Sequence, residues 1–126
     1  MLERVADHGQ VGYNLGKLNP TSEGTMQTFV FPTKQQMAEA AAAQAARSLQ
    51  DAIARRGHAT FVAATGASQF EFLEALTSLE GIDWARTTMF HLDEYIGLPE
   101  SHPASFRRYL RERLIERVHP GTVHLI

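Results

Sequence analysis

The sequence has 126 residues, 44% of them hydrophobic and 21% charged, and its formal net charge is −2. These values are typical of one globular domain, and the small net charge gives no reason to expect a nucleic-acid or membrane partner. No signal-like segment and no run of about 18 apolar residues occurs, so we expect a cytoplasmic protein. The chain contains no cysteine, which excludes disulfides, thiolate metal ligands and cysteine nucleophiles.

The N-terminal part of the chain is predicted to lead into one long helix. Residues 1–27 are rich in Gly, Asn, Thr and Ser and show no hydrophobic period, so they are interpreted as an arm or loop. Residues 28–31 are predicted to form a short strand. A helix is predicted over residues 34–56, because Thr33 and Gln36 have the spacing of a capping box and Gly57 typically ends a helix. Its expected buried stripe is Met37, Ala41, Ala45, Leu49 and Ile53.

A strand, a turn and a second helix are predicted next. Residues 59–64 form an apolar run of strand length, as expected when both faces of a strand are covered. The turn at residues 65–68 follows it, and Ser68 and Glu71 again have the spacing of a capping box. The helix after the turn has an apolar stripe that Gly81 ends, formed by Phe72, Leu73, Leu76 and Leu79.

The remaining elements complete an alternating pattern. Strands are predicted at residues 87–92 and 123–126, and a helix at residues 103–118, with Pro103 in its first turn. Alternation of strands and helices predicts an α/β fold: a three-layer α/β/α arrangement around a mainly parallel, Rossmann-like sheet of about four strands. Because the sequence stops inside a strand expected to be buried, we expect this architecture to be truncated.

The turn Thr65-Gly66-Ala67-Ser68 is the first candidate site. A glycine lets a ligand approach the backbone closely, and the free N–H groups at a helix start attract phosphate. The alternative is that Ser68 only caps its helix and Gly66 only turns the chain, which requires no ligand.

The acidic pair Asp93 and Glu94 is the second candidate site, at the carboxyl end of a predicted strand. Ligands bind at this edge of an open α/β sheet, and a carboxylate there can act as a general base. Neighbouring residues of an extended segment point to opposite sides, so at most one of the two faces a shared site. The alternative is that one caps a turn and the other is solvated.

Six histidines occur, but none has the spacing of a metal site. His91 and His102 flank the acidic pair and could bind a metal only if the intervening loop folds back. We therefore predict no metal site and no cofactor.

Taken together, these motifs resemble the glucosamine-6-phosphate deaminase/isomerase family, whose fold the 6-phosphogluconolactonases share. The resemblance rests on residues 65–68, on Asp-Glu-Tyr-Ile-Gly-Leu at residues 93–98 and on His-Pro-Ala-Ser at residues 102–105, and the last two look like the deaminase branch. It implies that Asp93 moves a proton between C2 and C1 of an open-chain amino-sugar phosphate, with Glu94 and His91 as possible supporting residues. It also implies that the 6-phosphate is bound by Thr65, Gly66, Ala67 and Ser68.

The sequence departs from the family pattern in three respects. Gln69 stands where proline usually follows the phosphate loop, and His91 stands where asparagine is common. The resemblance covers only residues 28–126, interpreted as the N-terminal half of the family domain, without the ring-opening histidine or the distal basic phosphate ligands. We therefore expect a chain that is inactive alone and either self-associates or pairs with a chain carrying the other half. The alternatives are a non-catalytic sugar-phosphate-binding or regulatory module and, more weakly, a lactonase-type hydrolase.

Overall fold

The computed structural model describes residues 28–126 of the chain. They begin with the long helix α1 (Lys34–Arg56), which leads into strand β1 (Ala59–Ala63). The helix has the predicted bounds. Its N-cap Thr33 accepts a hydrogen bond from the Gln36 N–H at 3.1 Å, and Gly57 ends it with a φ of 77°, in the left-handed region that glycine adopts without strain.

A 3-10 turn (Ala67–Gln69) and helix α2 (Phe70–Ser78) connect β1 to strand β2 (Thr87–His91). The chain then forms one helical segment in three parts, namely α3 (Phe106–Leu110), a π-helical turn (Arg111–Ile115) and α4 (Glu116–Val118). The last element of the chain is the short strand β3 (Thr122–His124).

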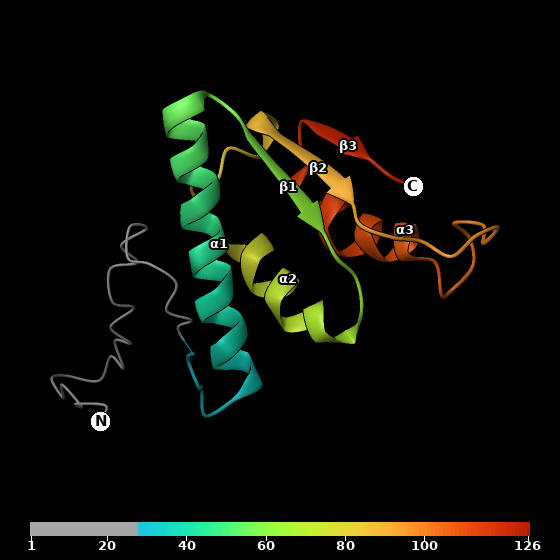
Figure 1. The fold of residues 1–126 in the computed structure, drawn as a ribbon, viewed down its shortest axis with the longest axis horizontal. Helices are drawn as coiled ribbons and strands as arrows, with labels where there is room; N and C mark the ends of the chain where they lie inside the picture. The colour runs from blue at the N-terminus through green and yellow to red at the C-terminus, as the bar shows by residue number, and fades with distance from the viewer. Residues whose placement is uncertain (1–27) are drawn as a thin grey trace, which may run out of the picture.

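The three strands form one parallel sheet in the order β1-β2-β3. The register pairs Ala59 with Thr87 and Ala63 with His91, so β1 and β2 end at the same level. Figure 1 shows the two arrowheads pointing to the same edge of the sheet. The predicted α/β class and parallel sheet are therefore confirmed.

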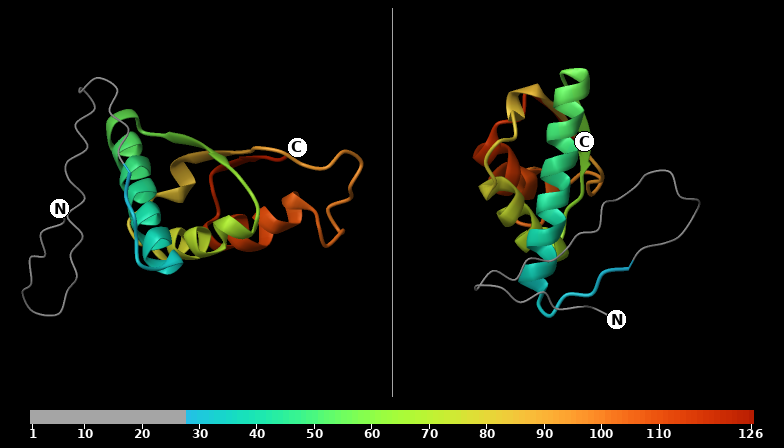
Figure 2. Two further views of the ribbon diagram at one scale, coloured as in Figure 1. Left: turned by 60° about the horizontal axis from the view of Figure 1, so that its bottom comes forward. Right: turned by 90° about the vertical axis from the view of Figure 1, so that its left-hand side faces the viewer.

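Of the three predicted layers, two lie within the described residues. Figure 2 shows α2 and α3 under the same face of the sheet. On the strands, Ala63 and Met89 of this covered face are buried, whereas Val62 and Phe90 of the opposite face are 60% and 41% exposed. Consecutive right-handed crossovers that advance in one direction place their helices on one face, which explains this arrangement.

The core consists of two adjoining groups of buried side chains beneath the covered face. One joins α1 to β1 and α2 through small alanines, which let the helix backbone approach closely. The other joins β2 and α2 to the C-terminal helical segment around Met89, Leu110 and Leu114, of which at most 1% is exposed. The buried residues of α1 are Ala38, Ala42, Ala46 and Leu49, so the predicted stripe was displaced by one residue over most of its length.

Two further predictions about elements were wrong. Residues 28–31 contain no strand, because they do not join the sheet formed by the strands at residues 59–63, 87–91 and 122–124, and Phe29 and Val30 are 51% and 86% exposed. The third helix starts at Phe106 rather than around Pro103, because Ser105 is its N-cap and accepts a hydrogen bond from the Arg108 N–H. The predicted arm at residues 1–27 lies outside the described residues.

Candidate active site at the carboxyl edge of the sheet

The turn after β1 depends on Gly66. Its φ of 118° and ψ of 167° lie in a region that side chains with a Cβ rarely adopt. Its carbonyl oxygen accepts hydrogen bonds from the Gln69 N–H at 3.0 Å and from the Tyr109 hydroxyl at 2.9 Å. The predicted capping box of Ser68 and Glu71 does not form, because α2 starts only at Phe70 and Ser68 lies inside the 3-10 turn.

The same turn presents three backbone donors. Within residues 28–126, no protein acceptor contacts the N–H groups of Gly66, Ala67 or Ser68. Ser68 is exposed and does not cap the helix, so the interpretation of this turn as a simple cap is not supported. Unsatisfied N–H groups ahead of a helix form a site where an anion is favoured.

Asp93 lies at the same level of the neighbouring strand end. Because Ala63 pairs with His91, Thr65 and Asp93 both come two residues after that pair. The Leu92 N–H donates to the Ala63 carbonyl at 3.1 Å, so the two segments stay side by side beyond the strands. The structure therefore brings the two candidate motifs to one edge of the sheet.

The carboxylate of Glu94 binds backbone and side-chain donors at the start of α3. Its carboxylate accepts hydrogen bonds from the Tyr95, Phe106 and Arg107 N–H groups at 2.9 to 3.1 Å and from the Ser105 hydroxyl at 2.9 Å. Burial raises the pKa of this carboxyl, but the hydrogen bonds from backbone N–H groups and from Ser105 outweigh burial and lower the pKa to about 2. Its side chain is only 4% exposed. Glu94 is thus a capping carboxylate and not a free base.

Asp93 is the accessible member of the acidic pair. It is exposed and forms no hydrogen bond or ion pair within the described part of the chain. The contacts of Glu94 explain why the two carboxylates differ: Glu94 turns toward α3, and Asp93 lies on the other side of an extended segment. Of the two carboxylates, Asp93 is the one available to a ligand.

His91 lies on the covered face at the end of β2 and is 5% exposed. Neither ring nitrogen has a hydrogen-bond partner within the described residues. Burial lowers the pKa of His91, while the nearby charges of Glu94 and Asp93 oppose that shift. The ring is therefore favoured in its neutral form beside the acidic pair.

The structure contains no clustered metal ligands among residues 28–126. His102, which flanks the acidic pair in the sequence, accepts a hydrogen bond at its Nδ1 atom from the Ala104 N–H at 3.1 Å. It therefore stabilises the turn before α3. In the same part of the chain, no helix is both long and apolar enough to cross a membrane.

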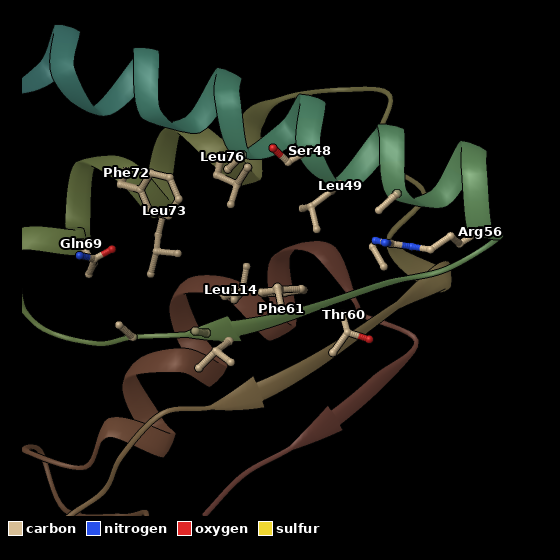
Figure 3. Close-up of a pocket in the computed structure, with 16 residues that line it drawn as sticks. Ser48, Leu49, Arg56, Thr60, Phe61, Gln69, Phe72, Leu73, Leu76 and Leu114 are labelled. Carbon is tan, nitrogen blue, oxygen red and sulfur yellow. The ribbon is translucent and has the colours of Figure 1, made fainter. Parts of the chain in front are cut away.

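Two cavities lie near this edge but do not include Asp93. A cavity of about 440 Å³ between α1, β1 and α2 is lined mainly by Ala and Leu side chains, with Gln69 at one end (Figure 3). A second cavity of about 300 Å³ includes Ser68 and the ion pair of Lys34 and Glu71, whose atoms are 2.6 Å apart. Both adjoin the turn after β1 on its α1 side.

Tyr109 was missed by the sequence reasoning. It lies 43 residues after Gly66 and reaches the turn through its hydroxyl group. The sequence places residue 109 in the predicted helix at residues 103–118, but no local signal in the sequence pairs it with the turn. Only the packing of α3 beside α2 reveals this contact.

Sequence comparison identifies related proteins. The sequence profile described as glucosamine-6-phosphate isomerases/6-phosphogluconolactonase matches residues 32–126. A glucosamine-6-phosphate deaminase of Pseudarthrobacter chlorophenolicus is 34% identical over 84 residues, which are 64% of this chain and 32% of that protein. One of Arthrobacter sp. (strain FB24) is 33% identical over 104 residues, which are 79% of this chain and 38% of that protein.

Solved structures agree with this relationship. A 6-phosphogluconolactonase from Shewanella baltica has a TM-score of 0.69 and 26% identity, over 75% of this chain and 40% of its own. A monomeric glucosamine-6-phosphate deaminase has a TM-score of 0.65 and 24% identity, over 79% of this chain and 42% of its own, and shows a shared fold. The chain thus spans about a third to two fifths of the length of these relatives. It belongs to the glucosamine-6-phosphate isomerase/6-phosphogluconolactonase family.

Proposed function

We propose that this chain supplies the proton-transferring base and the phosphate loop of a glucosamine-6-phosphate deaminase. The observation that supports the proposal is that the two neighbouring carboxylates, Asp93 and Glu94, have different surroundings. Glu94 is held by the start of α3, whereas Asp93 is exposed two residues beyond the paired end of β2, level with the turn after β1. The named deaminase relatives support the choice of substrate.

In this reaction Asp93 takes the proton from C2 of open-chain glucosamine 6-phosphate and returns it to C1. The aldose is thereby converted to a ketose-level imine, and addition of water at C2 releases ammonia and leaves fructose 6-phosphate. Proton transfer by one carboxylate requires that the sugar be held firmly, because small displacements of the reacting carbon are costly.

The turn at residues 65–68 holds the 6-phosphate in this proposal. The N–H groups of Gly66, Ala67 and Ser68 have no protein acceptor in the described residues, and they precede α2, whose dipole favours an anion. Gln69 in place of proline leaves this arrangement unaffected, because the contacts come from the backbone.

A lactonase function is the second candidate, since structures of 6-phosphogluconolactonases match this chain. Lactone hydrolysis and aldose–ketose isomerisation both use a phosphorylated sugar, so the phosphate loop does not distinguish them. A non-catalytic sugar-phosphate-binding module would likewise use the loop, but it would have no use for Asp93.

The decisive variant is Asp93→Asn in a full-length family protein that contains this segment. The amide has nearly the shape of the carboxylate but cannot accept the C2 proton, so we expect formation of fructose 6-phosphate and ammonia to fall by at least about a hundredfold. Binding of glucosamine 6-phosphate and the unfolding temperature should be nearly unchanged.

Asp83→Asn is the matched control. Asp83 is a half-exposed carboxylate that pairs with Arg86 at 3.2 Å, before the amino end of β2, so its loss should leave turnover unchanged. If Asp93→Asn retained normal turnover, Asp93 would not be the base. If the unsubstituted protein hydrolysed 6-phosphogluconolactone and left glucosamine 6-phosphate unchanged, the lactonase candidate would replace the deaminase.

A further inference from the structure

Tyr109 of α3 anchors the turn after β1 from a distant part of the chain. Its hydroxyl donates a hydrogen bond of 2.9 Å to the carbonyl oxygen of Gly66, 43 residues earlier in the sequence. The same oxygen accepts the Gln69 N–H at 3.0 Å. A carbonyl oxygen has two lone pairs, so these two donors occupy its full accepting capacity.

This contact determines where the next backbone donor points. The carbonyl of Gly66 and the N–H of Ala67 belong to one planar trans peptide, in which the two bonds point in opposite directions. Fixing the carbonyl toward Tyr109 therefore directs the Ala67 N–H away from Tyr109. Within residues 28–126 that N–H has no protein acceptor.

The ring of Tyr109 is itself held in place. Phe70, the first residue of α2, stacks on it with ring centroids 5.6 Å apart and an angle of 22° between the planes. The Cζ atom of Arg113, in the π-helical turn, lies 4.0 Å from the Phe70 ring centroid and 5.4 Å from that of Tyr109. Arg113 forms no ion pair with a carboxylate among the described residues, so its cation is available for these ring contacts.

We propose that Tyr109, braced by Phe70 and Arg113, is a positioning residue that preorganises the turn at residues 65–68 for binding a phosphate group. The inference rests on the proposed function of that turn and assigns it a support from a different element of the fold. A hydrogen bond to the Gly66 carbonyl also polarises the peptide, which strengthens the Ala67 N–H as a donor to an anion. Burial raises the pKa of Tyr109, so its hydroxyl keeps the proton that it donates.

The test compares phosphate binding by the 126-residue chain and by Tyr109→Phe. This substitution removes the hydroxyl and keeps the stacked ring and the Arg113 contact. Titration calorimetry with inorganic phosphate should show an affinity about three- to tenfold lower for the variant, the effect expected for one lost hydrogen bond. The proton resonance of the Ala67 amide should shift downfield with phosphate in the unsubstituted chain and much less in the variant.

Ser78→Ala is the matched control for loss of a hydroxyl–carbonyl hydrogen bond. Ser78 donates to the Glu74 carbonyl at 2.8 Å, at the opposite end of α2, so its variant should bind phosphate with unchanged affinity. Arg113→Lys keeps the positive charge but loses the planar ring contact, and it should weaken phosphate binding by about twofold. This variant tests the brace even if Tyr109→Phe does not fold.

The possible results separate this inference from the function on which it rests. If the unsubstituted chain bound phosphate and neither Tyr109→Phe nor Arg113→Lys changed the affinity or the Ala67 amide shift, the positioning role would be wrong and the phosphate loop would stand. An equal loss in Ser78→Ala would also overturn the positioning role, because general destabilisation would then explain it. A chain that bound no phosphate would overturn the phosphate loop and this inference together.

Discussion

At the scale of single residues, the acidic pair shows how adjacent and chemically similar groups acquire different roles. Sequence reasoning allowed at most one of Asp93 and Glu94 to face a site, because neighbours in an extended segment point apart. It did not identify Glu94 as the capping residue, because all of its donors except the Tyr95 N–H come from residues 105–107, after an intervening loop. In the structure Glu94 holds that loop to α3, and its supporting role in catalysis stays a prediction.

Glu94→Gln should destabilise the fold at neutral pH. The amide group of glutamine is neutral and directs one NH₂ group toward donors that now bind a carboxylate, so we expect a loss of about 1–3 kcal/mol in the free energy of unfolding. Urea unfolding followed by circular dichroism measures this loss. Glu112→Gln is the control, because Glu112 pairs with Arg108 on an exposed surface and should cost less than about 1 kcal/mol.

The loss in Glu94→Gln should depend on pH in a defined direction. The pKa of Glu94 is about 2 in the folded chain, below its ordinary 4.5. The stability that its ionised form contributes is therefore fully present above about pH 4.5 and is lost as the pH falls through about 2. The difference between the two proteins should narrow between pH 4.5 and pH 3, and a constant difference over this range would show that the carboxylate charge is not responsible.

At the scale of elements, the capping residues predicted where α1 begins and ends more accurately than the apolar stripe predicted which face of it is buried. The bounds of α1 followed from Thr33 and Gly57, whose cap geometries are present as predicted. The buried face of α1 was misplaced by one residue over most of its length, because the helix is so rich in alanine that several i+4 rows look equivalent. Caps are local, whereas the choice of face depends on β1 and α2, which the helix sequence does not encode.

Thr33→Ala should weaken α1 by removing its N-cap. The Gln36 N–H would lose its side-chain acceptor, so thermal unfolding should report a loss of about 1 kcal/mol. Thr33→Ser keeps the hydroxyl and should remain within about 0.3 kcal/mol of the unsubstituted chain. Equal stability of the alanine and serine variants would mean that the cap contributes nothing measurable.

The C-terminal helical segment departs from the regular α-helical spacing that its sequence predicts. Leu110 and Leu114 are buried, but residues 111–115 between them form a π-helical turn, which the i+4 spacing of these leucines does not reveal. The π turn contains Arg113, whose guanidinium contacts Phe70 and Tyr109. Such a contact between two helices is not visible in the pattern of either helix alone.

At the scale of the whole molecule, the alternation of strands and helices predicted the parallel sheet, because right-handed crossovers leave few other arrangements. The apolar run at residues 59–64 was interpreted as covered on both faces, yet Val62 is 60% exposed in the described structure. None of the elements described in residues 28–126 covers this second apolar face of β1. The sequence of the strand alone does not identify an element that packs on it.

The candidate site follows from the same global arrangement. The register of β1 and β2 places Thr65 and Asp93 at one level, and the sequence could predict this only by assuming that the two strands are neighbours. The parts of the site that come from other elements, above all Tyr109 and the donors to Glu94, required the packed structure.

The central claim is that the two strand ends form one sugar-phosphate site. The most direct measurement is a ¹⁵N–¹H NMR titration of the 126-residue chain with glucosamine 6-phosphate, and with glucosamine for comparison. We predict that the phosphorylated sugar shifts the amides of Gly66, Ala67 and Ser68 together with that of Asp93, and that glucosamine without phosphate leaves the first three unchanged. Equal shifts with both sugars, or shifts confined to surfaces away from residues 65–68 and Asp93, would contradict the account.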